Sequence, residues 1–461
     1  MLVRRRGHQE MKGRNMHTKK LNLIFSAMIL FFCFFTEYAL SADKLTLQQS
    51  IDLALSQSVI IQSAREGVKG AEAQKQEAFT GFLPKFSSSY SYQRYNEEPG
   101  VTIPLNIPGF PSFLPSATKD NYSWVVEVKQ PIFAGGGILA NYRANRIGRE
   151  IASMDEASVV QDIIQDVRVA YFNVLKAEKN LVVAKQSVEQ LEAHRNMSQD
   201  FFDAGVIPKN DLLRSEVELA NGRQNLVRAE NGVEIAKARF NTVLRREINT
   251  PTEVEDILTL RDYAKSLDEC RQLAMENRTE IKSYTQKIEQ SRKLVDVAKS
   301  EYFPSVNVVG HYERYGDDPS VNGSPLRNAD NSYVMGVASW NFWEWGRTKN
   351  RVDASRSREN QATYALENLK DQVSLDVKNS WLALQESRKQ VAVTQKAIEQ
   401  AEENYRITQE RYREQVGTAT DVVDAQTLLT RARSDYFNAL SDYNISIARL
   451  ERAMGVREAL P

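Results

Sequence analysis

The chain contains the same pattern twice, and this duplication constrains its fold more than any other feature. A helical stretch ends in the sequence GFLP (residues 81–84), and a second one ends in EYFP (residues 301–304), about 220 residues later. Elsewhere the offset is about 210 residues, so that Tyr171 matches Trp381 and Asp211 matches Asp421. Each copy is predicted to run helix, strand, loop, strand, very long helix, tip and return helix. The duplication therefore predicts two structural repeats.

Composition favours long helices. The 461 residues include only 21 Gly and 13 Pro, and long stretches between them are rich in Ala, Glu, Gln, Lys, Arg and Leu. The chain holds 60 basic and 60 acidic residues, and residues 1–42 hold seven basic against two acidic. The remainder is therefore slightly acidic, which argues against a nucleic-acid-binding protein.

Residues 1–42 are predicted to be a signal peptide with an N-terminal extension. Lys19 and Lys20 precede an apolar run of about 15 residues, and the small residues at 39–42 are suited to cleavage. The run is short for a membrane span of roughly 20 residues, although a signal anchor remains the alternative. After cleavage Cys270 is the only cysteine left in this sequence, which excludes an intrachain disulfide and a cysteine-based metal site there.

The apolar spacing and the Gly and Pro positions divide the rest of the chain. We expect a first repeat over 43–247, a connector over 248–266 and a second repeat over 267–461. Continuous helices are predicted over 46–80 and 267–300, and residues 97–120 are too rich in Pro for regular structure. Alternating patterns predict strands over about 85–95, 121–131, 305–315 and 332–342.

A very long helix is predicted from about residue 137 to Phe202. Its roughly 65 residues would span about 100 Å. Val160, Ile164, Val167 and Tyr171 keep the spacing of three to four residues that coiled-coil packing requires. The second repeat has a matching long helix that opens at Gly346.

The four predicted strands have the length and alternation of transmembrane β-barrel strands, with Tyr90, Tyr92, Tyr122 and Trp124 on the apolar faces. Four strands cannot close a barrel, because known barrels need at least about eight. If these strands enter a membrane, several chains must share one barrel. The alternative is a pair of soluble hairpins that cap a helical stalk.

Several motifs occur in order along both copies. They are the FLP and YFP ends of the short helices, QPIFAGG at 130–136, FDAG at 202–205 with DLL at 211–213, and RY at 411–412 followed by Gly417 and DVVDAQ at 421–426. Together they resemble the TolC family of outer-membrane efflux and secretion channels, over essentially all of residues 45–455.

This resemblance implies an α+β membrane protein that forms a homotrimer. The duplicated unit of helix, hairpin and long helix would build a 12-stranded β-barrel in the outer membrane of a Gram-negative bacterium. The barrel would continue into an α-helical coiled-coil tunnel across the periplasm, with the connector as an equatorial belt.

The resemblance also implies a passive exit duct for efflux or type I secretion, neither an enzyme nor dependent on a cofactor. Its partners would be outer-membrane lipid, a periplasmic adaptor (membrane fusion) protein and an inner-membrane pump of RND, ABC or MFS type. The alternative function is a periplasmic coiled-coil adaptor or scaffold without membrane strands.

Three acidic residues match positions where the family has acidic residues at the narrow periplasmic mouth: Asp211, Asp421 and Asp424. In a trimer each would form a ring of three carboxylates that attracts cations, and repulsion within a ring would raise the pKa values. Asp211 and Asp421 also follow a tip and precede an apolar helix, so both are candidate N-caps. Asp424 lies one turn further on and is the best candidate for the gate ring.

Tyr412 and Arg411 are candidate gate contacts. Residues 417–420 are Gly-Thr-Ala-Thr and offer no Arg to pair with the carboxylates, so Arg411 or Arg413 is a possible substitute. The second tip has Gln415 where the first has Gly205, and the two tips therefore need not have the same shape.

The remaining candidates are structural. Gly135, Gly136 and Gly346 are predicted at strand-to-helix turns, and Pro84 and Pro304 at helix-to-strand turns. The glycine run lacks the Gly-Lys-Ser/Thr of a phosphate-binding loop. Beyond residue 42 only His194 and His311 remain, far apart in the sequence, and we predict no metal site and no catalytic set.

Overall fold

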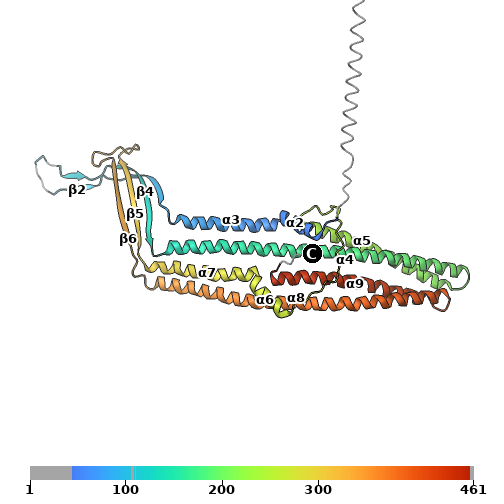
Figure 1. Ribbon diagram of the computed structural model, residues 1–461. Coiled ribbons are helices and arrows are strands. Elements are labelled where there is room, and N and C mark those ends of the chain that lie inside the picture. The colour runs from blue at the N-terminus through green and yellow to red at the C-terminus, as the bar shows by residue number, and fades with distance from the viewer. Residues whose placement is uncertain (1–43, 105–107, 110, 457–461) are drawn as a thin grey trace, which may run out of the picture.

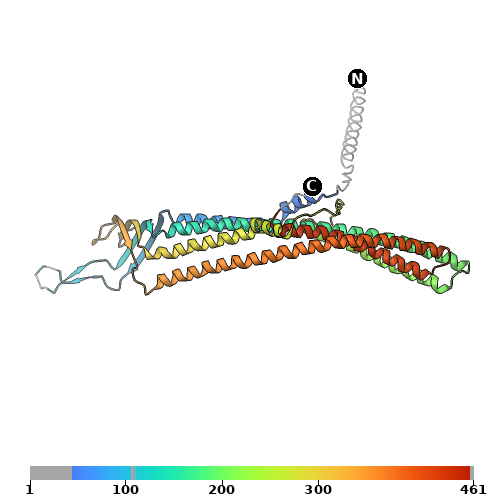
Figure 2. The ribbon, with the colours of Figure 1, turned by 60° about the horizontal axis from the view of Figure 1, so that its bottom comes forward.

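The protein is long and narrow, with a β-sheet at one end and two helical tips at the other (Figure 1). The computed structural model describes residues 44–104, 108–109 and 111–456, so the predicted export signal at residues 1–42 lies outside the described residues. Long helices run side by side between the two ends, as Figure 2 shows from a second direction. None of the helices in the described part of the chain is both long and apolar enough to cross a membrane.

The two repeats have the same order of elements. The first contains α2 (Leu47–Gln57), α3 (Val59–Thr80), β1 (Lys85–Arg94), β2 (Gly100–Thr102), β3 (Phe113–Pro115), β4 (Asp120–Ala134), α4 (Gly137–Asp203) and α5 (Lys209–Val243). The second contains α6 (Leu267–Asn277), α7 (Thr279–Lys299), a short 3-10 helix η1 (Ser300–Tyr302), β5 (Ser305–Gly316), β6 (Asp330–Ser339), α8 (Arg347–Arg413) and α9 (Ala419–Met454).

The lengths of the matched elements agree closely. Helices α4 and α8 each have 67 residues, close to the length predicted for α4, and each spans about 100 Å. Elements before the hairpin loops are offset by about 220 residues and elements after them by about 210. The difference arises because the loop between β5 and β6 is shorter than the loop between β1 and β4.

The prediction of continuous helices over 46–80 and 267–300 is wrong at one residue in each. The chain leaves the helical conformation at Ser58 (ψ 118°) and at Arg278 (ψ 119°). The Ser58 hydroxyl accepts a hydrogen bond from the N–H of Ile61 (3.3 Å), which caps α3. The Arg278 guanidinium donates to the carbonyl of Ala453 (3.1 Å). Apolar spacing continues across both breaks, so periodicity alone does not reveal them.

The sheet joins the two repeats. Its strands are antiparallel in the order β1-β4-β5-β6, so β4 of the first repeat pairs with β5 of the second. Strand β4 has an irregularity between Pro131 and Phe133, where proline has no N–H to donate. Strand β6 ends at Ser339 opposite Ser305, before the predicted end at residue 342, because β5 begins there. Strands β1 and β6 form the two edges of the sheet.

The Pro-rich segment 97–120 contains regular structure, contrary to the prediction. Strands β2 and β3 pair antiparallel within it, from Gly100 opposite Pro115 to Thr102 opposite Phe113. Prolines stand outside or at the end of these short strands, where a missing N–H removes no ladder hydrogen bond.

The matched residues Tyr171 and Trp381 hold the connector to the two long helices. The Tyr171 hydroxyl donates to the carbonyls of Leu45 (3.0 Å) and Glu255 (2.8 Å), and the Trp381 indole donates to the carbonyl of Lys265 (3.3 Å). Tyr171 is fully buried in the apolar cluster of the first repeat, and Trp381 packs against the corresponding cluster of the second. The connector therefore lies against the middle of the helices.

Candidate functional site at the helical tips

The two tips have the same backbone geometry. Gly205 has a φ of 73° and Gln415 a φ of 59°, both in the left-handed region. In each tip the following N–H bonds to the carbonyl five residues earlier, at 2.8 Å and 2.9 Å. The sequence left open whether the two tips share a shape, and at this turn they do. Gln415 adopts the conformation that glycine has in the first tip, at a backbone cost of about 1 kcal/mol.

Tyr412 joins the ends of the two long helices. Its hydroxyl lies 3.0 Å from the hydroxyl of Ser198 on α4, and its ring packs against His194 (5.1 Å) and Phe201 (5.4 Å). Burial raises the pKa of Tyr412, the hydrogen bond with Ser198 opposes that rise, and the charge of Asp211 adds to it. Tyr412 is thus a buried contact between the two repeats of one chain.

His194 and Ser198 belong to this contact although sequence reasoning did not select them. The three-to-four spacing of buried positions in α4 continues through Leu191, His194, Ser198 and Phe201. This spacing was the sequence signal that could have identified His194 and Ser198. Only 4% of His194 is exposed, and its Nε2 has no hydrogen-bond partner among the described residues. Burial lowers the pKa of His194 to about 4, and the imidazole is therefore neutral at pH 7.

Asp421 belongs to a capping box and is not the N-cap, which corrects one prediction. Thr418 is the N-cap of α9: its hydroxyl accepts from the N–H of Asp421 (3.2 Å), and its own N–H donates to the Asp421 carboxylate (3.0 Å). These two hydrogen bonds, assisted by the charge of Arg411, lower the pKa of Asp421. Within one chain the shift is thus opposite to the rise expected from a ring of carboxylates.

Asp211 is not an N-cap either. Helix α5 begins at Lys209 with Pro208 as its N-cap, and Asp211 lies in the first turn. Proline fits this boundary because its missing N–H and fixed φ cost nothing there. The Asp211 carboxylate instead stabilises the positive end of the helix dipole.

Asp424 is exposed one turn further along α9. It makes no hydrogen bond or ion pair with the residues that the structure describes, and it takes no part in the contacts of Tyr412 or Asp421. Arg413 pairs with Glu410 (3.4 Å), and Arg411 acts on Asp421 through its charge rather than through an ion pair within 4.0 Å. One chain therefore leaves Asp424 available to other molecules.

The turns between sheet and helices use glycine in left-handed conformations. Gly136 (φ 82°) and Gly346 (φ 79°) are the N-caps of α4 and α8. Gly135 also has a positive φ, and a Cβ there would lie 2.3 Å from the carbonyl oxygen of Ser300. Pro84 and Pro304 directly precede β1 and β5.

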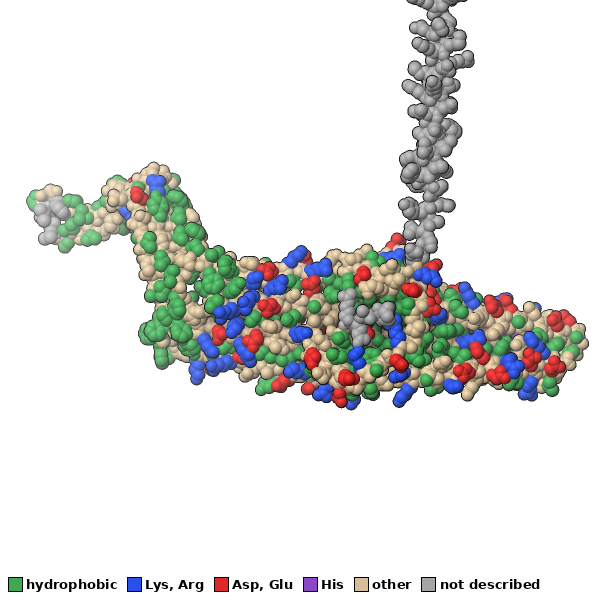
Figure 3. Space-filling model, viewed as in Figure 1, with side chains coloured by type: hydrophobic (Ala, Val, Ile, Leu, Met, Phe, Trp, Pro, Cys, Tyr) green, Lys and Arg blue, Asp and Glu red, His purple; other side chains and the backbone are tan. Residues whose placement is uncertain are grey.

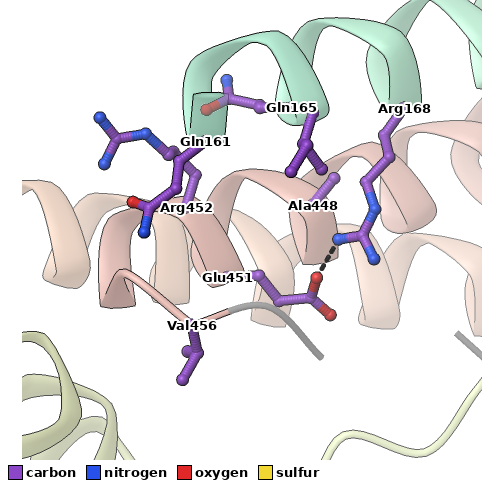
Figure 4. Close-up of a pocket in the computed structure, with 8 residues that line it drawn as sticks. Gln161, Gln165, Arg168, Ala448, Glu451, Arg452 and Val456 are labelled. Atoms are coloured by element: carbon purple, nitrogen blue, oxygen red, sulfur yellow. Dashed lines mark hydrogen bonds and ion pairs between the residues drawn. The ribbon is translucent and has the colours of Figure 1, made fainter. Parts of the chain in front are cut away.

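A buried ion pair joins the middle of α4 to the C-terminal end of α9 (Figure 4). Arg168 of α4 points toward Glu451 of α9, and both side chains are almost fully buried. The cavity beside them has a volume of about 20 Å³, which is room for about one water and none for a substrate. This pair therefore has a structural role.

Glu280 is the centre of a second ion-pair group nearby. Arg452 of α9 contacts the carboxylates of Glu280 and Asp162, each at 2.6 Å, and Arg278 contacts Glu280 at 3.3 Å. Burial raises the pKa of Glu280, but the hydrogen bond from Arg452 and the charges of Arg452 and Arg278 outweigh it and hold the pKa at about 2. The group ties α7, α4 and α9 together at the break between α6 and α7.

Comparison with known proteins matches both repeats. The model of a protein family described as outer membrane efflux protein matches residues 50–244 and 270–456. The protein CyaE of Bordetella pertussis is 22% identical over 429 residues, which cover 90% of this chain and 84% of CyaE. Outer membrane protein TolC of Vibrio cholerae is 23% identical over 319 residues, 66% of this chain and 70% of TolC.

Solved channel structures share the fold. The Campylobacter jejuni CmeC outer membrane channel aligns with a TM-score of 0.74 at 20% identity, over 89% of this chain and 85% of CmeC. The open state of the Neisseria gonorrhoeae MtrE outer membrane channel aligns with a TM-score of 0.71 at 18% identity, over 89% of each chain. The overall fold is therefore that of these channels.

Proposed function

The chain belongs to the outer membrane efflux protein family, and from this premise we propose that three copies assemble into one passive conduit across the outer membrane and the periplasm. The protein is an outer-membrane channel for efflux or secretion, with its helices in the periplasm. The proposal concerns the assembly, its gate and its partners.

The observation that carries the proposal is a four-stranded sheet with two open edges, attached to helices of 67 residues. Unpaired backbone groups at β1 and β6 would each cost several kcal/mol in lipid. Pairing of β6 in one protomer with β1 in the next removes both edges, and three copies then give a closed barrel of twelve strands. This number exceeds the minimum of about eight strands.

The helices continue this assembly as a coiled-coil tunnel. Family membership supports engagement by a periplasmic adaptor protein and by an inner-membrane pump of RND, ABC or MFS type, which supplies the energy. The conduit itself performs no catalytic chemistry and needs no cofactor.

Asp424 is proposed as the main gate residue, with Asp421 and Asp211 beside it and with Arg411 and Tyr412 as contacts. Three copies would place three Asp424 carboxylates around one axis, and like charges in a constriction attract cations and repel anions. The exposure of Asp424 and its lack of a partner among the described residues support this role. Asp421 contributes less because its carboxylate is bound to the backbone of its own tip.

Single-channel conductance in a planar bilayer tests the proposal. We expect the purified protein to give a small cation-selective conductance and Asp424→Asn to reduce that selectivity. Asp203→Asn is the matched control, because Asp203 is an exposed carboxylate at the other tip. If no protein concentration gives conductance, the membrane-barrel assembly is wrong. If Asp424→Asn and Asp203→Asn have the same selectivity as the unmodified protein, the channel stands and Asp424 is not in the gate.

A further inference from the structure

Two lysines lie directly opposite each other in the sheet. Lys85 of β1 pairs with Lys129 of β4 in the antiparallel register. Directly opposite residues point to the same side of a sheet, and both lysine side chains are exposed. Among the residues that the structure describes, neither lysine has an ion-pair partner. Like charges in this arrangement destabilise a strand pair, so the two lysines need a reason beyond folding.

The second repeat shows that the strands do not require lysine here. The matching residues are Ser305 and Ser339, which also lie directly opposite each other. Lysine on an edge strand prevents pairing with wrong partners, and this would account for Lys85 on β1. Lys129 is different, because β4 pairs with β1 on one side and with β5 on the other. Neither strand geometry nor protection of an edge therefore explains the pair.

The two lysines lie on the polar side of the sheet, which we name the lysine face. The alternation of the strands places on this face Ser87, Ser89, Ser91, Ser123 and Glu127. It places on the other face Phe86, Tyr90, Tyr92, Trp124, Val126 and Val128. Hydrophobic side chains over the sheet are visible in Figure 3, next to Lys and Arg gathered on the adjoining ends of the helices. Since a transmembrane barrel turns its apolar face to lipid, the lysine face would line the lumen.

Acidic residues on the lysine face offset only part of the positive charge. Glu127 lies two residues from Lys129 on the same strand. The second carboxylate on this face of the four strands is that of Glu313, which is bound to Arg327 of the following loop (2.8 Å). The two lysines and Glu127 therefore leave a net positive charge in each chain, at the end of the β1–β4 pair that adjoins the helices.

We propose that Lys85 and Lys129 form an anion-binding ring in the lumen of the barrel, for solutes that carry two or more phosphate or carboxylate groups. The inference rests on the proposed barrel: three copies with two lysines each would place six ammonium groups around one lumen. Converging like charges concentrate counter-ions, and ammonium groups bind phosphate and carboxylate as compact charges. The acidic ring proposed at the helical tips has the opposite sign, so the two ends of the conduit would hold different solutes.

Three serines of β1 provide matched positions for a thiol probe. Ser87 and Ser91 share the lysine face, and Ser88 lies on the other face. Ser91 is six residues from Lys85, about 20 Å along the strand, which exceeds the Debye length of about 8 Å at physiological salt. Each serine is replaced by Cys in a Cys270→Ala background of the full chain. The variants are placed in lipid nanodiscs, which leave both ends of the protein open to solution, and treated with an anionic or a cationic methanethiosulfonate.

The positive potential of the lysines should favour the anionic reagent at Ser87→Cys. Adding Lys85→Gln and Lys129→Gln should lower the ratio of the anionic to the cationic rate there by about threefold or more. The matched control is Lys85→Arg with Lys129→Arg, which keeps both charges and should leave the ratio unchanged. Neither double change should alter the ratio at Ser91→Cys. The same ratio at Ser87→Cys with glutamine as with lysine would overturn the proposal.

Sodium tripolyphosphate tests for binding of a multivalent anion. At constant ionic strength it should slow the anionic reagent at Ser87→Cys when both lysines are present, and it should have no such effect in the glutamine form. If it does not slow the reagent in the lysine form, the lysines do not form a binding site and the proposal is wrong.

The reactivity of Ser88→Cys separates failure of the ring from failure of the barrel. In nanodiscs Ser88→Cys should react far more slowly than Ser87→Cys, because lipid covers the apolar face. If the two react at the same rate, the sheet does not form a barrel with the lysine face inward, and both proposals fail. If Ser88→Cys is protected but the lysine changes have no effect at Ser87→Cys, the conduit stands and only the ring is refuted.

Discussion

Replacing Glu280 with Gln should destabilise the fold at neutral pH and lose about half of that effect at pH 3. The Glu280 carboxylate accepts from Arg452 (2.6 Å) and pairs with Arg278 (3.3 Å), and these contacts hold its pKa at about 2. A glutamine keeps the size of the side chain and removes the charge. The two guanidinium groups then lose a shared anion in a half-buried site.

The magnitude follows from linkage between protonation and folding. A carboxyl whose pKa falls from 4.5 in the unfolded chain to about 2 in the folded chain contributes about 3 kcal/mol when fully ionised. Because the folded pKa is the lower one, this contribution is complete above pH 4.5 and is lost as the pH falls toward 2. At pH 3 roughly 1.5 kcal/mol should remain.

The assay is urea unfolding of Glu280→Gln and the unmodified protein in the same detergent, at pH 7 and at pH 3. The matched control is Glu276→Gln, because Glu276 is an exposed carboxylate nearby in the sequence, at the end of α6, and should change stability by less than about 0.5 kcal/mol. An equal difference between Glu280→Gln and the unmodified protein at both pH values would refute the reasoning, as would a loss of the same size for Glu276→Gln.

Three further changes are each tested by denaturant midpoint in detergent; the first and third concern contacts between the repeats, and the second concerns strain in one tip. Arg168→Met should cost about 3–5 kcal/mol because it leaves the Glu451 carboxylate buried without this cation, and adding Glu451→Leu should recover most of that loss; a double variant as unstable as the single one contradicts this. Gln415→Gly should raise the free energy of unfolding by about 1 kcal/mol, and an unchanged midpoint would show that the left-handed tip carries no strain. Tyr412→Phe should cost about 1 kcal/mol, and Ser198→Ala should then add little, since the two hydroxyls share one hydrogen bond.

The sequence predicted what depends on spacing and duplication. The long helix was predicted to end near Phe202 and α4 ends at Asp203, because a continuous apolar stripe and a glycine turn define that boundary. The equivalence of Tyr171 and Trp381 was visible from the offset alone, and both residues bind the connector region. The export signal and the assembly of several chains stay predictions.

Features that depend on local contacts were missed. The helix breaks at Ser58 and Arg278 lie inside unbroken apolar spacing, so the spacing does not reveal them. Asp421 was predicted as a candidate N-cap, but the N-cap of α9 is Thr418. Asp and Thr are both good N-cap residues, and the sequence does not locate the start of the helix to within three residues. His194 was not selected from the sequence, and only the packing of α4 against α8 shows that its ring contacts Tyr412.

The duplicated backbone also indicates where the two repeats have diverged in use. Three pairs of matched residues have left-handed conformations in both repeats: Gly135 and Trp345, Gly205 and Gln415, and Arg245 and Gly455. Each pair keeps glycine in one repeat and has a long side chain in the other, and Arg245, Trp345 and Gln415 are all exposed. Packing within the chain therefore does not explain why these side chains replace glycine, and each costs backbone strain. The two repeats therefore keep one backbone at these turns while their sequences differ, and the residue that replaces glycine adds strain without a gain in burial.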